Sequence, residues 1–217
     1  MAYINLHTHH SSNEEDVLDI VNIYPDESEA SAKFYSTGIH PWHINPENLE
    51  KELNIIENRM GQANCLALGE CGLDKRIETP LSLQLEVFEK QLLMAEKYQK
   101  PVIVHCVAAF GEAIEIRKRL KISVPTIIHG FSKNIEIAKQ LLDHGFYLSF
   151  GKYLLRNPEL ESVFTSVPDN KFFLETDTIE EGIREVYSLA AKYRKISESE
   201  LKDIVNTNFK TVFKPQK

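Results

Sequence analysis

Short runs of apolar and β-branched residues alternate along this chain with longer stretches in which apolar residues recur every three or four positions. The short runs predict strands, and the longer stretches predict helices. We expect eight strands, at residues 2–9, 17–23, 33–39, 65–70, 101–105, 125–129, 146–150 and 171–177. We expect helices at residues 46–60, 79–99, 110–120, 134–144, 181–193 and 197–213, with a short helix after Pro158.

The succession of strands and helices predicts an α/β fold, a (β/α)₈ TIM barrel. Its early βα units are trimmed, because no helical pattern separates the first strand from the second and little separates the second from the third. The run at 101–105 is apolar throughout, as expected for a parallel strand covered on both faces. With 217 residues, of which 42% are hydrophobic, we expect one domain spanning 1–217.

Two local signals mark the ends of helices. Asn45 is placed to cap a helix that starts at Pro46, and Ser197 with Glu200 has the spacing of a capping box at the start of the last helix. These signals fix where the helical patterns begin.

Charge and composition narrow the possible functions. The net charge of −7 argues against tight, sequence-independent wrapping of a polyanion, which rests on many Lys and Arg contacts. No apolar run is long enough to cross a membrane and no segment resembles a secretory signal, so we expect a cytoplasmic protein without a membrane partner or an evident obligate protein partner. The three cysteines form no C-x-x-C pair and are expected to be buried fillers.

Metal-competent side chains recur where the predicted strands end. His7 and His9 are two residues apart, so in a strand they project from the same face and form half of a site for a divalent metal. The other candidates close the fourth, fifth, sixth and eighth strands: Glu70, His105, His129 and Asp177. Because TIM barrels place their active sites at the carboxyl ends of the strands, we expect these side chains to converge on a metal site.

Six segments carry a resemblance to a known family. The segments LHTHH, GIHPWHI, LGECGLD, PVIVHC, IIHGFS and FLETD resemble, in order and spacing, the TatD family of metal-dependent hydrolases, usually described as deoxyribonucleases. The resemblance implies a shortened member with a metal-dependent hydrolase barrel and two divalent ions, and hydrolysis of DNA phosphodiester bonds in the 3′ to 5′ direction. It implies one ion held by His7, His9, Glu70 and Asp177, and a second held by Glu70, His105 and His129.

Physical chemistry agrees with these roles. Two neighbouring ions need a bridging oxygen ligand, which the carboxylate of Glu70 supplies and an imidazole cannot. Water activated by the two ions would attack phosphorus, with Asp177 as the general base. The ions could be zinc, magnesium or manganese. Glu175 shares the face of Asp177 and is expected to be an inner-barrel partner or a group that supports a ligand from behind, rather than a ligand.

A second set of residues is predicted near the substrate. His40 and His43, which follow the third strand, are expected to hydrogen-bond a phosphate oxygen, although both could be ordinary loop histidines. Trp42 could stack on a nucleobase or form a hydrophobic plug over the barrel. Asp74 matches the family segment and is expected to orient a ligand.

Two departures from the family pattern bear on the substrate. Family members commonly carry Arg, and often Asp, soon after the histidine of the fifth strand, whereas this chain has Val107 and Ala108. The long loop rich in Pro and Arg that usually follows the ETD segment is replaced by a direct entry into a helix. We therefore expect a DNA end or a small phosphoester as substrate rather than long duplex DNA.

Other functions remain open from the sequence. LHTHHS alone also suits an amidohydrolase or a PHP-type hydrolase of a small substrate, although amidohydrolases often place a carbamylated lysine where this chain has Glu70. A third possibility is a non-catalytic metalloprotein that retains the fold.

Overall fold

Strands follow the predicted succession closely. The computed structural model describes residues 1–27 and 32–213. In chain order the strands are β1 (Tyr3–Thr8), β2 (Val17–Ile23), β3 (Tyr35–Thr37), β4 (Cys65–Asp74), β5 (Val102–Val107), β6 (Thr126–Ile128), β7 (Tyr147–Phe150) and β8 (Phe172–Leu174). They are ordered from β1 to β8 in one sheet, so each strand neighbours the next along the chain.

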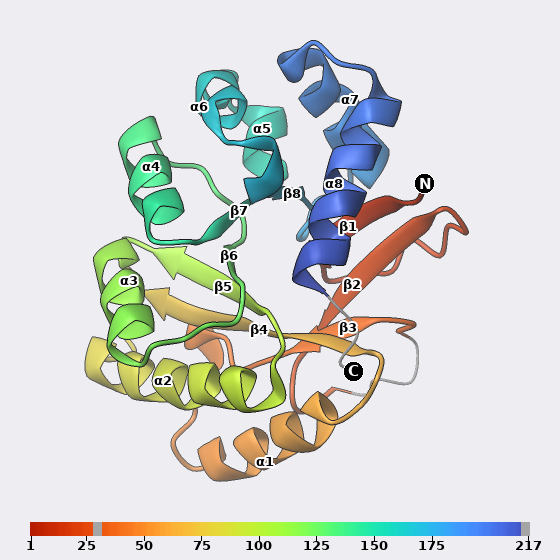
Figure 1. Cartoon of the computed structure of the whole chain (residues 1–217). Helices are drawn as coiled ribbons and strands as arrows, with labels where there is room; N and C mark the ends of the chain where they lie inside the picture. The colour runs from red at the N-terminus through yellow and green to blue at the C-terminus, as the bar shows by residue number, and fades with distance from the viewer. Residues whose placement is uncertain (28–31, 214–217) are drawn as a thin grey trace. The chain divides into compact units, whose positions relative to one another are not determined.

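Helices follow most of these strands (Figure 1). The α-helices are α1 (Leu49–Met60), α2 (Leu81–Tyr98), α3 (Phe110–Arg119), α4 (Ile135–Asp143), α5 (Lys152–Arg156), α6 (Leu160–Ser166), α7 (Ile183–Arg194) and α8 (Glu198–Val212). Two short 3₁₀ helices are η1 (Pro41–His43) and η2 (Asp169–Lys171). No helix lies in the described residues between β1 and β2 or between β2 and β3, as the trimmed early units predicted.

Contacts divide the chain into two compact units. The first unit comprises residues 1–21 and 128–217, and the second comprises residues 22–127. The prediction of a single domain over 1–217 stays a prediction.

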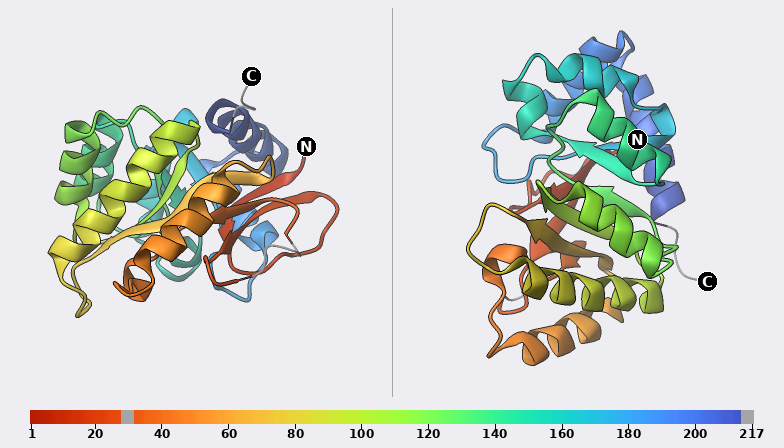
Figure 2. Two further views of the ribbon diagram at one scale, coloured as in Figure 1. Left: turned by 90° about the horizontal axis from the view of Figure 1, so that it is seen from below. Right: turned by 90° about the vertical axis from the view of Figure 1, so that its left-hand side faces the viewer.

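The second unit is built around the long strand β4. This strand pairs in parallel with β3 and with β5, and α1, α2 and α3 pack on these strands (Figure 2). Gly72, at φ 144°, lets β4 approach β5 closely, since a Cβ there would lie 1.9 Å from the carbonyl oxygen of His105. The close approach brings β4 side chains next to those of β5.

The first unit contains the N-terminal strand β1 and the C-terminal part of the chain. The two ends of the sheet order meet here, because Thr8 of β1 forms a parallel bridge with Asp177, just after β8. Helix α7 packs on β1, where the Tyr187 hydroxyl accepts a hydrogen bond from the backbone N–H of Ile4 at 3.1 Å. Helix α8 begins with the predicted capping box, in which the Ser197 and Glu200 side chains each accept a hydrogen bond from the other's backbone N–H.

Several element boundaries differ from the sequence predictions. Strand β4 continues to Asp74, so Glu70 lies inside the strand and not at its end. Helix α1 begins at Leu49, and Asn45 instead accepts a hydrogen bond from the backbone N–H of Glu47 in the turn before it. Asp177 follows β8 instead of ending it. Helix α5 and both 3₁₀ helices were not predicted, because short helices carry too few residues to show a periodicity.

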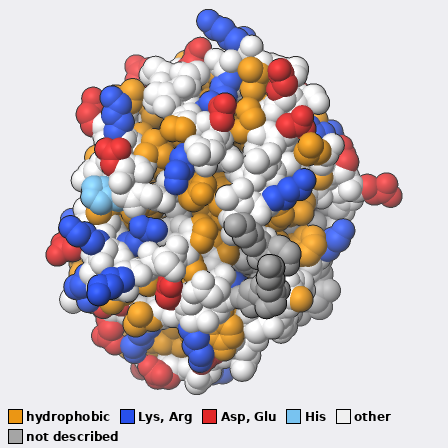
Figure 3. Space-filling view, in the orientation of Figure 1, with side chains coloured by type: hydrophobic (Ala, Val, Ile, Leu, Met, Phe, Trp, Pro, Cys, Tyr) orange, Lys and Arg blue, Asp and Glu red, His pale blue; other side chains and the backbone are white. Residues whose placement is uncertain are grey.

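The burial of the cysteines agrees with the sequence prediction. All three cysteines are buried, and none forms a disulfide. On the face shown in Figure 3, Lys and Arg side chains are interspersed with Asp and Glu and form no continuous basic patch. Among the described helices, none is both long enough and apolar enough to cross a lipid bilayer.

Candidate metal centre

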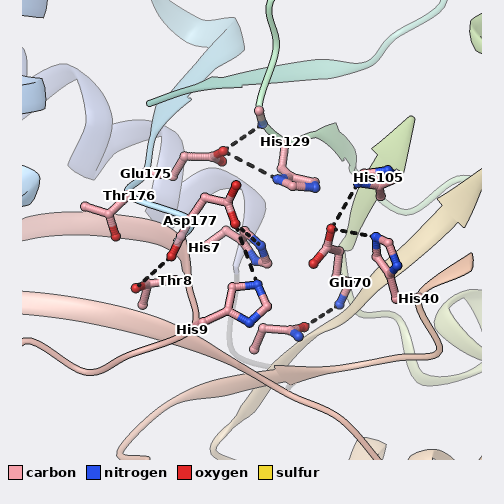
Figure 4. A network of polar contacts seen from close by, with 12 residues as sticks. His7, Thr8, His9, His40, Glu70, His105, His129, Glu175, Thr176 and Asp177 are labelled. Atoms are coloured by element: carbon pink, nitrogen blue, oxygen red, sulfur yellow. Dashed lines mark hydrogen bonds and ion pairs between the residues drawn. The ribbon is translucent and has the colours of Figure 1, made fainter. Parts of the chain in front are cut away.

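Within the first unit, His7 of β1 and His9, just after that strand, face an aspartate that follows β8. The Nε2 atoms of His7 and His9 lie 3.7 and 3.6 Å from Oδ1 of Asp177 (Figure 4). One ligand atom from each of the three residues lies within 4.8 Å of the other two. We call this set the aspartate cluster. His7 is fully buried, whereas the side chains of His9 and Asp177 are 18% and 24% exposed.

Backbone hydrogen bonds hold the aspartate cluster together. The N–H of Asp177 donates to the carbonyl of His7 at 2.9 Å, and the N–H of His9 donates to the carbonyl of Asp177 at 3.1 Å. β1 ends at Thr8, one residue before the predicted end, yet both imidazoles lie on the side of Asp177, as alternation predicted. Asp177 has φ 55°, a left-handed conformation that Asp and Asn adopt more readily than most residues. This turn of the backbone directs its carboxylate toward the histidines.

The buried side chain of Asn5 adds hydrogen bonds between β1 and the segment before Asp177. The Asn5 side chain accepts a hydrogen bond from the backbone N–H of Thr176 at 2.9 Å and donates to Asp19 at 2.9 Å. Asn5 therefore ties β1 to the residue that immediately precedes Asp177.

His129 and Glu175 form a second pair in the same unit. Oε1 of Glu175 lies 3.5 Å from Nδ1 of His129 and accepts a hydrogen bond from the backbone N–H of Gly130 at 2.7 Å. Burial opposes ionisation of Glu175, yet His129, together with the nearby His7 and Ser149, leaves its pKa below the usual value. The His129 and His7 ring centroids are 4.5 Å apart. Glu175 thus contacts His129 as a buried partner, the placement expected for it from the sequence.

Within the second unit, a buried glutamate sits between two histidines. Oε1 of Glu70 lies 3.2 Å from Nε2 of His40 and 3.1 Å from Nδ1 of His105 (Figure 4). One ligand atom from each of these residues lies within 4.8 Å of the other two. We call this set the glutamate cluster. Its position depends on β4 and β5 lying close together, which places Glu70 beside His105.

Side chains support the glutamate cluster from behind. The Asn22 side chain accepts a hydrogen bond from the Glu70 backbone N–H at 2.6 Å. Asp74 Oδ2 lies 3.6 Å from Nε2 of His105 and accepts the indole N–H of Trp42 at 2.8 Å. A carboxylate on the second ring nitrogen of a histidine is a common way to orient a metal ligand. Burial opposes ionisation of Asp74, but the hydrogen bonds from Trp42 and Arg76, with the nearby His105, leave its pKa below the usual value.

Both clusters have donor sets that fit a divalent metal. Each combines two imidazoles with one carboxylate, a mixture suited to zinc or manganese. Ligands held about 2 Å from one tetrahedral ion are separated by roughly 3.3 Å. The separations of 3.1 to 3.7 Å between carboxylate oxygens and imidazole nitrogens agree with that spacing.

The remaining sequence candidates lie around the glutamate cluster. Sequence reasoning did not predict that His40 would lie against Glu70, because it assigned His40 to a phosphate contact; the segment GIHPWHI was the available signal. His43 is exposed, with its ring centroid 5.0 Å from that of Tyr24 and 5.7 Å from that of His40. Trp42 is 59% exposed, and its roles in stacking on a nucleobase or as a hydrophobic plug over the barrel stay predictions.

Comparisons with known proteins agree with these features. The family model described as TatD related DNase matches residues 8–214. An uncharacterized metal-dependent hydrolase from Haemophilus influenzae is 29% identical over 153 residues, covering 66% of this chain and 58% of the relative. The 3′-5′ ssDNA/RNA exonuclease TatD of Citrobacter koseri is 28% identical over 148 residues, covering 65% of this chain and 56% of that protein. Both matches span less than two thirds of the relative's length.

A solved structure establishes the fold. The crystal structure of a TatD homologue from Escherichia coli K12 superposes with a TM-score of 0.81, at 19% identity, and covers 97% of each chain. The predicted TIM barrel is thereby confirmed, together with the eight strands in chain order. The chain therefore belongs to the TatD family of metal-dependent hydrolases.

Proposed function

We propose that this protein is a divalent-metal-dependent phosphodiesterase that acts on DNA ends or small phosphoesters, with the 3′ to 5′ exonuclease activity expected of a TatD-type deoxyribonuclease. The observation that carries the proposal is the pair of clusters, each with two imidazoles and one carboxylate whose ligand atoms lie within 4.8 Å of one another. Enzymes that catalyse in-line displacement at phosphorus commonly use two metal ions.

The two clusters would each contribute ligands to one ion. His7, His9 and Asp177 would hold the first, and Glu70 and His105 would hold the second. Bridging of both ions by Glu70 and ligation by His129 stay predictions from the family resemblance. His40, 3.2 Å from Glu70, would orient that carboxylate or join the ligand set.

The ions, when bound, would supply activation of water and stabilisation of negative charge at the phosphate. Asp177 is the group proposed to accept the proton. Its side chain is 24% exposed, so water and substrate can reach it, unlike Glu70, which is 4% exposed. Its backbone hydrogen bonds to β1 hold the carboxylate in place without occupying its oxygens.

The residues around the proposed ligands offer few groups to bind an extended substrate, which supports a small phosphoester or a strand end. β5 ends at the half-buried Val107, followed by the exposed Ala108, so no cation follows His105 there. After Asp177 the chain reaches α7 at Ile183, without a long loop. The curated relative from Citrobacter koseri is named an exonuclease on single-stranded DNA and RNA, which favours a strand end over duplex DNA as substrate.

The proposal is tested by metal removal and replacement. Elemental analysis of the purified protein should find divalent metal. Chelation should abolish hydrolysis of bis-p-nitrophenyl phosphate and of 3′-labelled single-stranded DNA, and added Mn²⁺, Mg²⁺ or Zn²⁺ should restore it. A panel of amides and lactones is the matched comparison. Metal-dependent turnover of that panel without phosphodiester turnover would assign an amidohydrolase, and bound metal without any turnover would assign a non-catalytic metalloprotein.

A further inference from the structure

Trp42 is an unusual residue for its surroundings. It is the only tryptophan of the chain, and its side chain is 59% exposed although it neighbours a buried cluster. Among the described residues, the other exposed large hydrophobic side chains are those of Met1, Leu93 and Tyr153. None of these three belongs to the glutamate cluster or to the residues that support it. Trp42 therefore differs from these three residues in that its exposed ring lies beside candidate metal ligands.

Hydrogen bonds at two points hold Trp42 in place. Its indole N–H donates to Oδ2 of Asp74 at 2.8 Å, and its backbone N–H donates to Nδ1 of His40 at 3.1 Å. Its ring meets the His40 ring edge-on, with centroids 5.0 Å apart and planes at 88°. A ring that is already immobilised loses little conformational entropy when another ring stacks on it.

Asp74 links this ring to the metal-ligand candidates. The carboxylate that accepts the indole N–H also lies 3.6 Å from Nε2 of His105. Asp74 is itself fixed, since its backbone N–H donates to the Gln84 side chain at 2.8 Å and its carbonyl accepts from that side chain at 2.9 Å. The Trp42 and His105 ring centroids are 5.8 Å apart. A phosphate held at the glutamate cluster would thus carry its neighbouring substituent within reach of the indole.

We propose that Trp42 is a stacking platform for the nucleobase adjacent to the phosphoester that is cleaved. The inference rests on the proposed function and names a feature of its substrate: a flat aromatic base next to the phosphate. Every nucleobase has a π-face, so a single platform of this kind selects for a base without selecting its sequence. Stacking on Trp42 would contribute to substrate binding without a cationic side chain after β5 to bind the phosphate.

Fluorescence of the single tryptophan gives a direct test of the platform. The purified protein is titrated with thymidine 5′-monophosphate and, separately, with 2-deoxyribose 5-phosphate, which has the same sugar and phosphate but lacks the base. We expect saturable quenching of the Trp42 emission by the nucleotide and none by the base-free compound. Equal responses to the two compounds would overturn the platform.

Variants provide an independent measurement by calorimetry. Trp42→Ala should weaken binding of thymidine 5′-monophosphate by about 5- to 150-fold, the range for loss of one stacked base, and leave binding of 2-deoxyribose 5-phosphate unchanged. Trp42→Phe should fall between, because it keeps a ring but loses the bond to Asp74. Tyr153→Ala removes another exposed ring, 44% exposed on α5, and should change neither affinity. Wild-type affinity for the nucleotide in Trp42→Ala would refute the proposal.

The two proposals can fail separately. Phosphodiester hydrolysis without base-dependent quenching would overturn the platform and leave the proposed function standing. Base-dependent quenching without hydrolysis of any phosphodiester would overturn the proposed function and support the platform as a binding site.

Discussion

The aspartate cluster and the glutamate cluster contain the same kinds of side chain but are supported in different ways. Backbone hydrogen bonds between β1 and Asp177 hold the aspartate cluster, and its carboxylate is 24% exposed. Side chains hold the glutamate cluster: Asn22 binds the backbone of Glu70, and Asp74 faces His105. Its carboxylate is buried.

We expect this difference to separate two chemical tasks. A buried carboxylate between two histidines is suited to being a permanent metal ligand, because burying a charge is tolerated only when it is paired or coordinated. A partly exposed carboxylate held through its backbone can exchange protons with water while staying in place. We therefore expect substitutions in the glutamate cluster to affect metal retention first, and substitution of Asp177 to affect turnover first.

The largest effect is expected for Glu70→Gln. The amide is a weaker ligand without charge, so phosphodiester hydrolysis should become undetectable and metal content should fall by at least one ion per chain. Elemental analysis and hydrolysis of bis-p-nitrophenyl phosphate measure both quantities. Glu78→Gln, an exposed site beyond the end of β4, is the control and should behave as wild type. Unchanged metal content in Glu70→Gln would remove Glu70 from the ligand set.

Asp177→Asn should lower kcat by about 10²- to 10⁴-fold, the usual contribution of a general base. Because Asn tolerates φ 55° as readily as Asp, the thermal unfolding temperature should stay close to that of wild type. The ion at the glutamate cluster should be retained. Glu180→Gln, an exposed carboxylate three residues later, serves as the comparison. Normal turnover in Asp177→Asn would show that another group accepts the proton.

Asp74→Asn should weaken metal affinity or activity by about 10- to 100-fold, as expected when the partner that orients a metal-ligating histidine is lost. Competition with a chromophoric chelator measures the affinity. Asp143→Asn, at an exposed position at the end of α4, removes one negative charge and is the control. Equal changes in metal affinity in the two variants would show that Asp74 does not orient His105 for metal binding.

Asn5→Ala should have the smallest effect on activity and act mainly on stability. The buried N–H of Thr176 would lose its acceptor, which should lower the free energy of unfolding by about 1–3 kcal/mol. Denaturant unfolding measures this loss. Asn54→Ala, at an exposed position of α1, should stay within about 0.5 kcal/mol of wild type. A loss of metal without a loss of stability in Asn5→Ala would mean that the aspartate cluster depends on side-chain support after all.

Sequence patterns predicted the fold class and the strand succession because both depend on local periodicity. β2 was predicted with the bounds observed, and the capping box at Ser197 was found as predicted. The His7 and His9 pair could be placed on one face because alternation along a strand is fixed by backbone geometry. The predicted end of β4 was wrong, because the glycine-permitted pairing with β5 is set by contacts distant in sequence. The predicted start of α1 was wrong, because Asn45 stabilises a turn through the backbone N–H of Glu47 instead of capping a helix.

The sequence by itself determined the residue types of the site, the order in which the strands deliver them and the face on which His7 and His9 lie. Only the tertiary structure decided that His40 lies against Glu70, that Asp74 joins Trp42 to His105, and that Asp177 is held by the backbone of β1. Those contacts join residues 30 to 170 positions apart, and no local pattern of polar and apolar residues encodes which distant partner a side chain meets.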